Sequence, residues 1–504
     1  METSEIRIDP LGKIEQENDS MKKWGTLLAL LIVLEVLNAA VYLRTADQLG
    51  FPLDDAWIHQ TYARNLGLHG MMAFSPGEPS TGSTSPAWTV LLAAGYLLQI
   101  PFFSWTYVWG SIFAILTAYT AGLLSHNYFG DFKRAVIVAI ICIIEWHLAW
   151  SALSGMEISL FIFFTLLISL CLHRNAPPYL MGLLIGLTFL VRPEGIILGG
   201  IYGLKLLLAN RRHSRQMFSD IGKFAIVFLL IISPWVVFNL NYTGRPFPST
   251  VSSKFMQYGY PWSLWNSMKY IWNVLIYFLA GPLMLLVPCA GFILYRVYHS
   301  RRIDLLYPLA WALTLVGLYA VTLPAIYHHG RYLMPLVPVL TIYGVEGLFQ
   351  FLTKLPRMSL LPPAIWLAFG IMLISLWVNG AATFALQTKL LNESHTEAAR
   401  WVDANAPRDA VIAAHDIGII GYVTQRQIVD LAGLVTPETI LIMNEQSQLA
   451  SFVREKQVTY VIVFSGYYRE MLAQLDAQLV FSPNSDNLKS LGLEPIEVYK
   501  VPSP

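Results

Sequence analysis

Long apolar runs, separated by short polar segments, occupy the chain as far as about residue 385. The first run covers Thr26 to Tyr42 and follows Lys22 and Lys23. Each run is long enough, or nearly so, to cross about 30 Å of hydrocarbon as a helix. Ten further runs lie at about 86–100, 105–125, 133–150, 156–172, 178–209, 221–240, 268–296, 305–323, 332–353 and 360–385. The pattern predicts a mainly α protein, a polytopic bundle of about eleven transmembrane helices within a range of about 11–13.

Positive charges between the runs predict the orientation of the bundle. Residues 1–24 are expected to form a cytoplasmic leader, because Lys and Arg are retained on that side of the membrane. The segment 44–85 is then the first extracytoplasmic loop of a transmembrane module that covers 25–390. Three later basic loops fit the same rule, whereas Lys133-Arg134 and His173-Arg174 fit it less well. An odd number of crossings places the C-terminus outside the cytoplasm.

The composition changes after about residue 385, and no later run has the length of a membrane span. Short apolar segments predict buried strands at 410–414, 427–431 and 458–464. Amphipathic segments between and before them predict helices near 397–405, 437–443, 447–456 and 467–477. Residues 391–504 are therefore expected to form a soluble, extracytoplasmic α/β domain.

Composition supports a membrane protein and excludes other classes. Of 504 residues, 55% are hydrophobic and only 13% are charged, against about 25% charged residues in soluble domains. The formal net charge of +1 gives no basic field for nucleic acid. The three cysteines all lie in apolar runs, which argues against a disulfide framework or a cysteine metal site. The expected environment is the lipid bilayer of a bacterial plasma (inner) membrane.

Candidate chemistry is concentrated in the first predicted loop, where Asp54 and Asp55 follow the first helix. One carboxylate could act as a general base toward a hydroxyl group. The other could orient it or help hold a divalent cation, Mg²⁺ or Mn²⁺. The alternative is that both residues only cap the short helix that begins near Trp57. His59 and Arg64 lie in the same loop and are candidate substrate-binding residues.

The block from Leu53 to His59, followed by Gly82 to Trp88, resembles the first loop of GT-C glycosyltransferases. These are polytopic enzymes that use polyprenyl-phosphate sugars, and the similarity is to a bacterial branch related to mycobacterial arabinofuranosyltransferases and mannosyltransferases. Further similar motifs are Ala152–Glu157, Arg192–Gly195 and His328–Tyr332. The resemblance implies a catalytic aspartate in the first loop. In this sequence that residue corresponds to Asp54 or Asp55. We favour Asp54 as the base, with Asp55 assisting.

Four further charged residues outside the Asp-Asp pair are candidates for substrate binding. Arg192 and Glu194 interrupt an apolar run, where charge is costly and suggests function. Arg192 could bind the donor phosphate, or it could form an internal ion pair in a broken helix. Glu157 could contact substrate or only cap a helix. Glu78 could be a second acid and, with Asp55, a metal ligand, or an ordinary loop carboxylate.

A second group of candidates could bind the phosphate of a lipid-linked donor. His328, His329, Arg331 and Tyr332 lie together at the predicted outer mouth of a helix. Anchoring at the membrane interface is the alternative for Arg331 and Tyr332. Lys254 is a further candidate cation.

The resulting function hypothesis is an enzyme, a hexosyl- or pentosyltransferase of the cell envelope. It would move a sugar from a polyprenyl-phosphate donor to a hydroxyl of a glycan, lipid or protein acceptor outside the cytoplasm, with inversion at the anomeric carbon. A flippase or transporter of a lipid-linked glycan is the alternative, and it predicts charges in the middles of several helices. A sensor or scaffold would leave the Asp54-Asp55 loop unexplained. The sequence does not identify the sugar or the acceptor.

Overall fold

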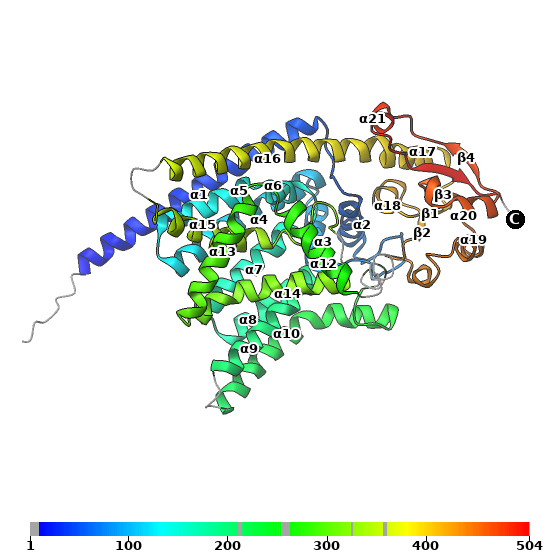
Figure 1. Ribbon diagram of the computed structural model, residues 1–504. Coiled ribbons are helices and arrows are strands. Elements are labelled where there is room, and N and C mark those ends of the chain that lie inside the picture. The colour runs from blue at the N-terminus through cyan, green and yellow to red at the C-terminus, as the bar shows by residue number, and fades with distance from the viewer. Residues whose placement is uncertain are drawn as a thin grey trace, which may run out of the picture.

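The computed structural model describes residues 10–209, 214–248, 250, 253, 263–323, 326–355 and 360–502. Helices dominate it as far as residue 405, and a small sheet follows (Figure 1). The helices and helical turns that precede the sheet are α1 (Pro10–Ala46), α2 (Asp54–His69), α3 (Pro86–Leu97), α4 (Phe102–Phe129), α5 (Phe132–Ile144), α6 (Trp146–Leu153), α7 (Ile158–His173), α8 (Pro178–Val191), η1 (Pro193–Gly195), α9 (Ile196–Ala209), α10 (Ser214–Thr243), α12 (Leu264–Asn273), η2 (Val274–Phe278), α13 (Pro282–His299), η3 (Ile303–Leu306), α14 (Tyr307–Thr322), α15 (Leu336–Leu352), α16 (Leu361–Leu391), η4 (Asn392–Thr396) and α17 (Glu397–Asn405).

Apolar helices of membrane length confirm the predicted polytopic bundle. Within the described ranges, six helices are long and apolar enough to cross a membrane, and the bent pair α5 and α6 could form a seventh span. The apolar helices α3, α7, α8 and α15 are shorter. Each predicted run coincides with one helix or with a pair of consecutive helices. The protein is therefore a mainly α membrane protein.

Arg192-Pro193-Glu194 divides the 178–209 run into the two short helices α8 and α9. Proline has no backbone N–H to donate and disfavours helical geometry in the residue before it. Arg192 accordingly has extended backbone angles, with φ −152° and ψ 134°. The break leaves the side chains of Arg192 and Glu194 inside the bundle rather than at a helix end in water.

The C-terminal region is the predicted α/β unit. Its helices and turns are α18 (Gly418–Thr424), η5 (Pro437–Leu441), α19 (Gln446–Glu455), η6 (Ser465–Tyr467), α20 (Arg469–Gln474) and α21 (Asp486–Ser490). Its strands are β1 (Val411–Ala414), β2 (Gln427–Asp430), β3 (Tyr460–Val463), β4 (Gln478–Phe481) and β5 (Glu497–Lys500). The strand order is β2-β1-β3-β5-β4, with β1 parallel to β2 and β3, and with β5 antiparallel to β3 and β4.

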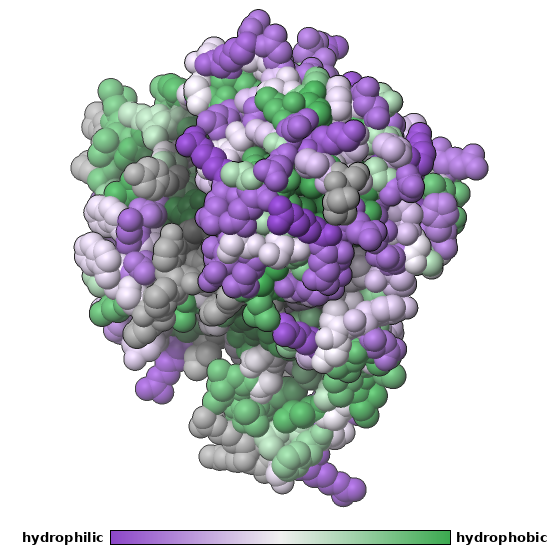
Figure 2. Space-filling model, turned by 90° about the vertical axis from the view of Figure 1, so that its right-hand side faces the viewer, coloured by the Kyte–Doolittle hydropathy of each residue, from purple (hydrophilic) through white to green (hydrophobic). Residues whose placement is uncertain are grey.

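A long helical rod joins the bundle to the sheet. The α16 helix continues through η4 into α17 without leaving helical geometry, so one rod extends from Leu361 to Asn405 (Figure 1). The predicted boundary at residue 391 falls inside this rod and stays a prediction. Figure 2 views the molecule from the sheet end, where hydrophilic residues gather over the C-terminal region and apolar residues lie below them. This arrangement suits a polar domain on one end of a membrane bundle.

Candidate active site

The α2 helix begins with Asp54 and Asp55, and two carboxylates are stabilised there by the positive end of the helix dipole. Leu53, the residue before them, is extended (φ −135°), and Gly70 ends the helix in the left-handed region (φ 67°). Successive residues on a helix point about 100° apart. The two neighbouring aspartates therefore face different surroundings.

Asp54 faces the C-terminal domain. Its carboxylate oxygens accept hydrogen bonds from the backbone N–H groups of Gly418 (2.7 Å) and Ile419 (2.8 Å), at the start of α18. Burial raises the pKa of Asp54 to about 7, although the nearby His395 charge and these two N–H groups oppose the increase. Asp54 does not line the cavity described below. Its contacts make it a joint between α2 and the C-terminal domain.

Two further contacts lie nearby, one between α2 and the C-terminal domain and one within the C-terminal part of the chain. Arg64 donates from Nη1 to the carbonyl oxygen of Tyr422 (2.6 Å), and its guanidinium lies over the Tyr422 ring. Asp416 pairs with His395 Nε2 at 3.0 Å. Burial alone would raise the pKa of Asp416, but the hydrogen bond and charge of His395 outweigh it and lower that pKa. Arg64, predicted as a substrate contact, holds two parts of the fold together instead.

Gly418 is required at this joint because a Cβ atom there would lie 2.0 Å from the backbone oxygen of Asp54. We expect Gly418→Ala to destabilise the protein by about 1–3 kcal/mol, the usual cost of forcing extra atoms into a packed site. Unfolding in detergent, with limited proteolysis of the C-terminal domain, measures the effect. The matched control is Gly222→Ala, where a Cβ atom meets nothing within 4 Å. Equal stability of the two variants would contradict the tight joint.

Asp55 faces the interior of the bundle and forms an ion pair with Arg331, with 2.5 Å between Oδ2 and Nη2. The Asp55 side chain is 28% exposed, whereas that of Arg331 is 2% exposed. Positive φ angles at His328 (41°), His329 (59°) and Gly330 (70°) turn the chain just before Arg331. Gly330 fits this turn without strain, and a Cβ atom there would lie 2.5 Å from the Phe278 ring.

Arg331 keeps two buried donors available. Its Nη2 group donates to Asp55 and to the hydroxyl of Tyr332, at 3.2 Å for the latter. Its Nε and Nη1 atoms are buried and have no hydrogen-bond partner within the part of the chain that the structure describes. An unsatisfied buried donor costs about 1–3 kcal/mol, and more when it is charged. The two groups are therefore suited to an anionic ligand.

Arg192 has a different environment, because carboxylates already neutralise it. Its Nη1 lies 3.2 Å from Glu157 Oε1, and its Nη2 lies 2.9 Å from Glu194 Oε1. The hydroxyl of Tyr319 also bonds to Glu194 and accepts from Arg192 Nη2 (3.3 Å). This geometry favours the internal ion pair over the phosphate-binding alternative for Arg192. The guanidinium also lies over the Tyr332 ring, 4.8 Å from its centroid.

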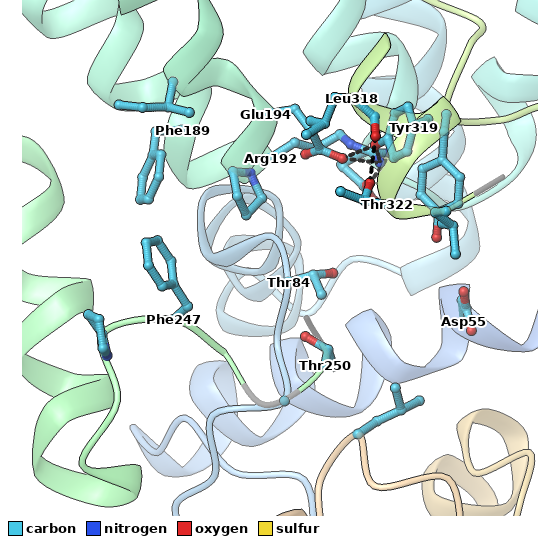
Figure 3. Close-up of a pocket in the computed structure, with 18 of the residues that line it drawn as sticks. Asp55, Thr84, Phe189, Arg192, Glu194, Phe247, Thr250, Leu318, Tyr319 and Thr322 are labelled. Carbon is cyan, nitrogen blue, oxygen red and sulfur yellow. Dashed lines mark hydrogen bonds and ion pairs between the residues drawn. The ribbon is translucent and has the colours of Figure 1, made fainter. Parts of the chain in front are cut away.

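These residues open onto one cavity of about 980 Å³. Its polar end includes Asp55, His59 and Arg331. The remaining wall is largely apolar and comes mainly from α8, α9, α10 and α14, with Phe189, Ile196, Ile197, Phe228, Ile232, Val236 and Leu318 among its residues. Figure 3 shows Asp55 on one side of the cavity, Phe189 and Phe247 on the other, and the Arg192–Glu194–Tyr319 cluster between the two sides. A polar pocket thus continues into an apolar channel.

Known structures share the fold of this chain. ArnT from Cupriavidus metallidurans bound to undecaprenyl phosphate is similar, with a TM-score of 0.62 at 11% identity over 94% of this chain and 98% of that one. The Archaeoglobus fulgidus oligosaccharyltransferase in complex with Zn and sulfate is similar, with a TM-score of 0.59 at 16% identity over 88% and 69% of the two chains. The chain has the GT-C fold. The fold that the sequence resemblance implied is thereby confirmed.

One family model matches the C-terminal part of the chain. Residues 385–497 match a family model described as a domain of unknown function (DUF8728). That segment contains the end of α16 and most of the α/β domain. Among curated proteins, none has significant sequence similarity to the chain.

The cavity brings together seven of the predicted site residues, namely Asp55, His59, Glu157, Arg192, Glu194, Arg331 and Tyr332. Four others lie elsewhere in addition to Asp54. Arg64 is at the joint, and Glu78 is exposed in its loop. His328 contacts the Tyr327 ring, and His329 packs between Trp146 and Trp150 and reaches Gln387. Lys254 lies outside the described residues.

Tyr319 is a cavity residue that the sequence reasoning did not select. It lies in an apolar run, where a tyrosine near the end is typical of a membrane interface and gives no signal of a buried network. Thr84 and Arg245 also line the cavity. Thr84 belongs to the Gly82–Trp88 motif, which was the available signal for it.

The predicted metal site at Asp55 and Glu78 does not fit the geometry. Asp55 lines the cavity and is paired with Arg331, whereas Glu78 is exposed and does not line that cavity. Among the described residues, no three His, Cys, Asp or Glu side chains form a group that could hold a metal ion.

Proposed function

We propose that the protein is a membrane glycosyltransferase that moves a sugar from a polyprenyl-phosphate donor to a hydroxyl of a cell-envelope glycan, lipid or protein. The observation that carries this proposal is the position of Arg331. Its Nε and Nη1 donors, which have no partner among the described residues, belong to a side chain paired with Asp55 at the polar end of a cavity whose wall is otherwise largely apolar. The undecaprenyl phosphate bound to ArnT, which has the same fold, supports a lipid phosphate as the ligand.

The donor lipid fits the cavity in one orientation. Phosphate oxygens only accept hydrogen bonds, and the free Arg331 groups only donate. Arginine also matches phosphate geometry well, because its planar guanidinium group can donate two parallel hydrogen bonds. The polyprenyl chain then lies along the apolar wall of α8 and α10, which includes Phe189, Phe228 and Ile232. The sugar is placed at the polar end, next to Asp55.

The reaction follows as a single displacement. Asp55 takes the proton from the acceptor hydroxyl, whose oxygen bonds to the anomeric carbon as the bond from that carbon to the phosphate oxygen breaks. Arg331 stabilises the charge that develops on the departing polyprenyl phosphate. The anomeric configuration inverts. The sequence favoured Asp54 as the base; we propose Asp55 instead, because Asp55 lines the cavity, and we assign Asp54 the role of positioning α2.

The proposed site faces outside the cytoplasm of a plasma (inner) membrane. This orientation rests on Lys22 and Lys23, which precede the first span, and on the cavity lying at the same end of the bundle as the α/β domain. The α/β domain contributes Leu434, Ile440 and Leu441 to the cavity wall, so domain and cavity lie on the same side. The acceptor peptide tethered to the Archaeoglobus fulgidus oligosaccharyltransferase, which has a similar fold, supports a peptide as one of the possible acceptors.

The test is transfer by the purified protein in detergent, with undecaprenyl-phosphate mannose, glucose and arabinofuranose as donors and a panel of glycan, lipid and peptide acceptors. We expect one donor to give a product with the inverted anomeric configuration, as read by NMR. Binding of these lipids with no transfer, together with their movement between leaflets in proteoliposomes, would favour the flippase instead. A product with retained configuration would contradict the single displacement.

A further inference from the structure

His59 lines the cavity, and the proposed mechanism does not use it. The residue is 3% exposed and lines the cavity one helical turn after Asp55. Its Nδ1 atom is buried and has no hydrogen-bond partner among the residues that the structure describes. Residues four apart on a helix share one face. His59 therefore faces the same space as Asp55.

The position of Glu157 favours the tautomer of His59 in which Nδ1 accepts a hydrogen bond. The other ring nitrogen, Nε2, lies 3.2 Å from Glu157 Oε2, and Arg192 holds Glu157 through its other oxygen. A carboxylate beside Nε2 stabilises the form with hydrogen on that atom. In the neutral ring, Nδ1 then carries a lone pair and accepts a hydrogen bond. It needs a donor, which a phosphate ester lacks and a hydroxyl group supplies.

Two of the residues that line the cavity, Arg331 and His59, have complementary unsatisfied groups within the described part of the chain. Arg331 offers donors for an anion, and His59 offers an acceptor for a hydroxyl group. The sugar of the donor lies beside the phosphate and carries such hydroxyl groups. We propose that Nδ1 of His59 accepts a hydrogen bond from a hydroxyl of the transferred sugar and so contributes to the choice of sugar. This inference rests on the proposed function and extends it to a specific sugar contact.

Binding of two related lipids separates this role from a structural one. Undecaprenyl phosphate carries the lipid and a phosphate monoester, and the undecaprenyl-phosphate sugars used above add the sugar and convert that monoester into a diester. Affinities are measured for wild type, His59→Phe and His59→Asn, with the donor that wild type binds most tightly. Asparagine can place an amide oxygen near the position of Nδ1, and phenylalanine cannot. His69→Phe is the matched control, because His69 is exposed at the end of the same helix.

We expect His59→Phe to weaken binding of the sugar-bearing lipid by about tenfold, the value of one buried hydrogen bond. Its affinity for undecaprenyl phosphate should change by less than about twofold, His59→Asn should recover much of the loss, and His69→Phe should match wild type. Equal weakening of both lipids would assign His59 a structural role and overturn the inference. Unchanged binding of both would overturn it too. If wild type bound the lipids without transferring sugar, the proposed function would fail independently of this comparison.

Discussion

Asp55→Asn lowers the kcat for sugar transfer by about 10²–10⁴-fold, the usual contribution of a general base. The amide has the shape of the carboxylate and can still accept from Arg331, but it cannot take a proton at neutral pH. We therefore expect the variant to fold and to bind undecaprenyl phosphate nearly as wild type does. Transfer rates at saturating donor, with lipid binding measured separately, give the result.

Asp54→Asn provides the comparison that identifies the base. Its amide can accept from one of the Gly418 and Ile419 N–H groups but directs its own N–H at the other. We expect a looser C-terminal domain, seen as faster proteolysis, with loss of activity that follows loss of stability. Asp47→Asn, at an exposed position before α2, controls for removal of charge. A fully active Asp55→Asn beside an inactive, stable Asp54→Asn would return the role of base to Asp54.

Arg192→Met destabilises the protein by about 3–5 kcal/mol, the cost of leaving a buried carboxylate without its partner. The Arg192 side chain is 9% exposed, and its partners Glu157 and Glu194 are 5% and 16% exposed. The change leaves two carboxylates close together in a poorly hydrated interior. Reversible unfolding in SDS, followed by tryptophan fluorescence, measures the loss.

The triple variant Arg192→Met, Glu157→Gln, Glu194→Gln is the control for this prediction. It removes all three charges while keeping similar side-chain volumes, and we expect it to recover more than half of the lost stability. Neutral replacement of a buried ion cluster is often tolerated, whereas removal of one member is not. A triple variant no more stable than Arg192→Met would show that the arginine acts through packing rather than charge.

Much of the fold follows from local properties of the sequence. Apolar runs of membrane length predict the helices of the bundle, because a bilayer requires continuous backbone hydrogen bonding along each span. The strands β1, β2 and β3 are short, strongly apolar segments, and their positions were predicted. The strands β4 and β5 were not predicted. Gln478 and Leu479 of β4 are exposed, so β4 lacks the apolar pattern of a buried strand.

The sequence also selected the loop that contains the site. Charges inside an apolar run are energetically costly, as are adjacent carboxylates after a membrane span. Both can therefore be recognised in the sequence without a structure. Seven of the chosen residues line the cavity. The sequence did not identify Tyr319 or the apolar residues of the cavity wall. A tyrosine or an isoleucine is an ordinary residue in a membrane helix, and only its neighbours make it part of a site.

By itself, the sequence determined that this is a polytopic membrane protein with a C-terminal α/β region, and it selected Asp54-Asp55, Arg192 and Arg331 as candidate site residues. Only the tertiary structure decided which aspartate faces the cavity. Neighbouring residues on a helix point in different directions, and the residues that surround each of them come from distant segments of the chain. Arg331 reaches Asp55 across 276 positions of sequence, and Gly418 reaches Asp54 across 364. The spacing of residues along the chain does not predict such contacts. Packing alone divides the pair into Asp55, which faces the cavity, and Asp54, which contacts the C-terminal domain.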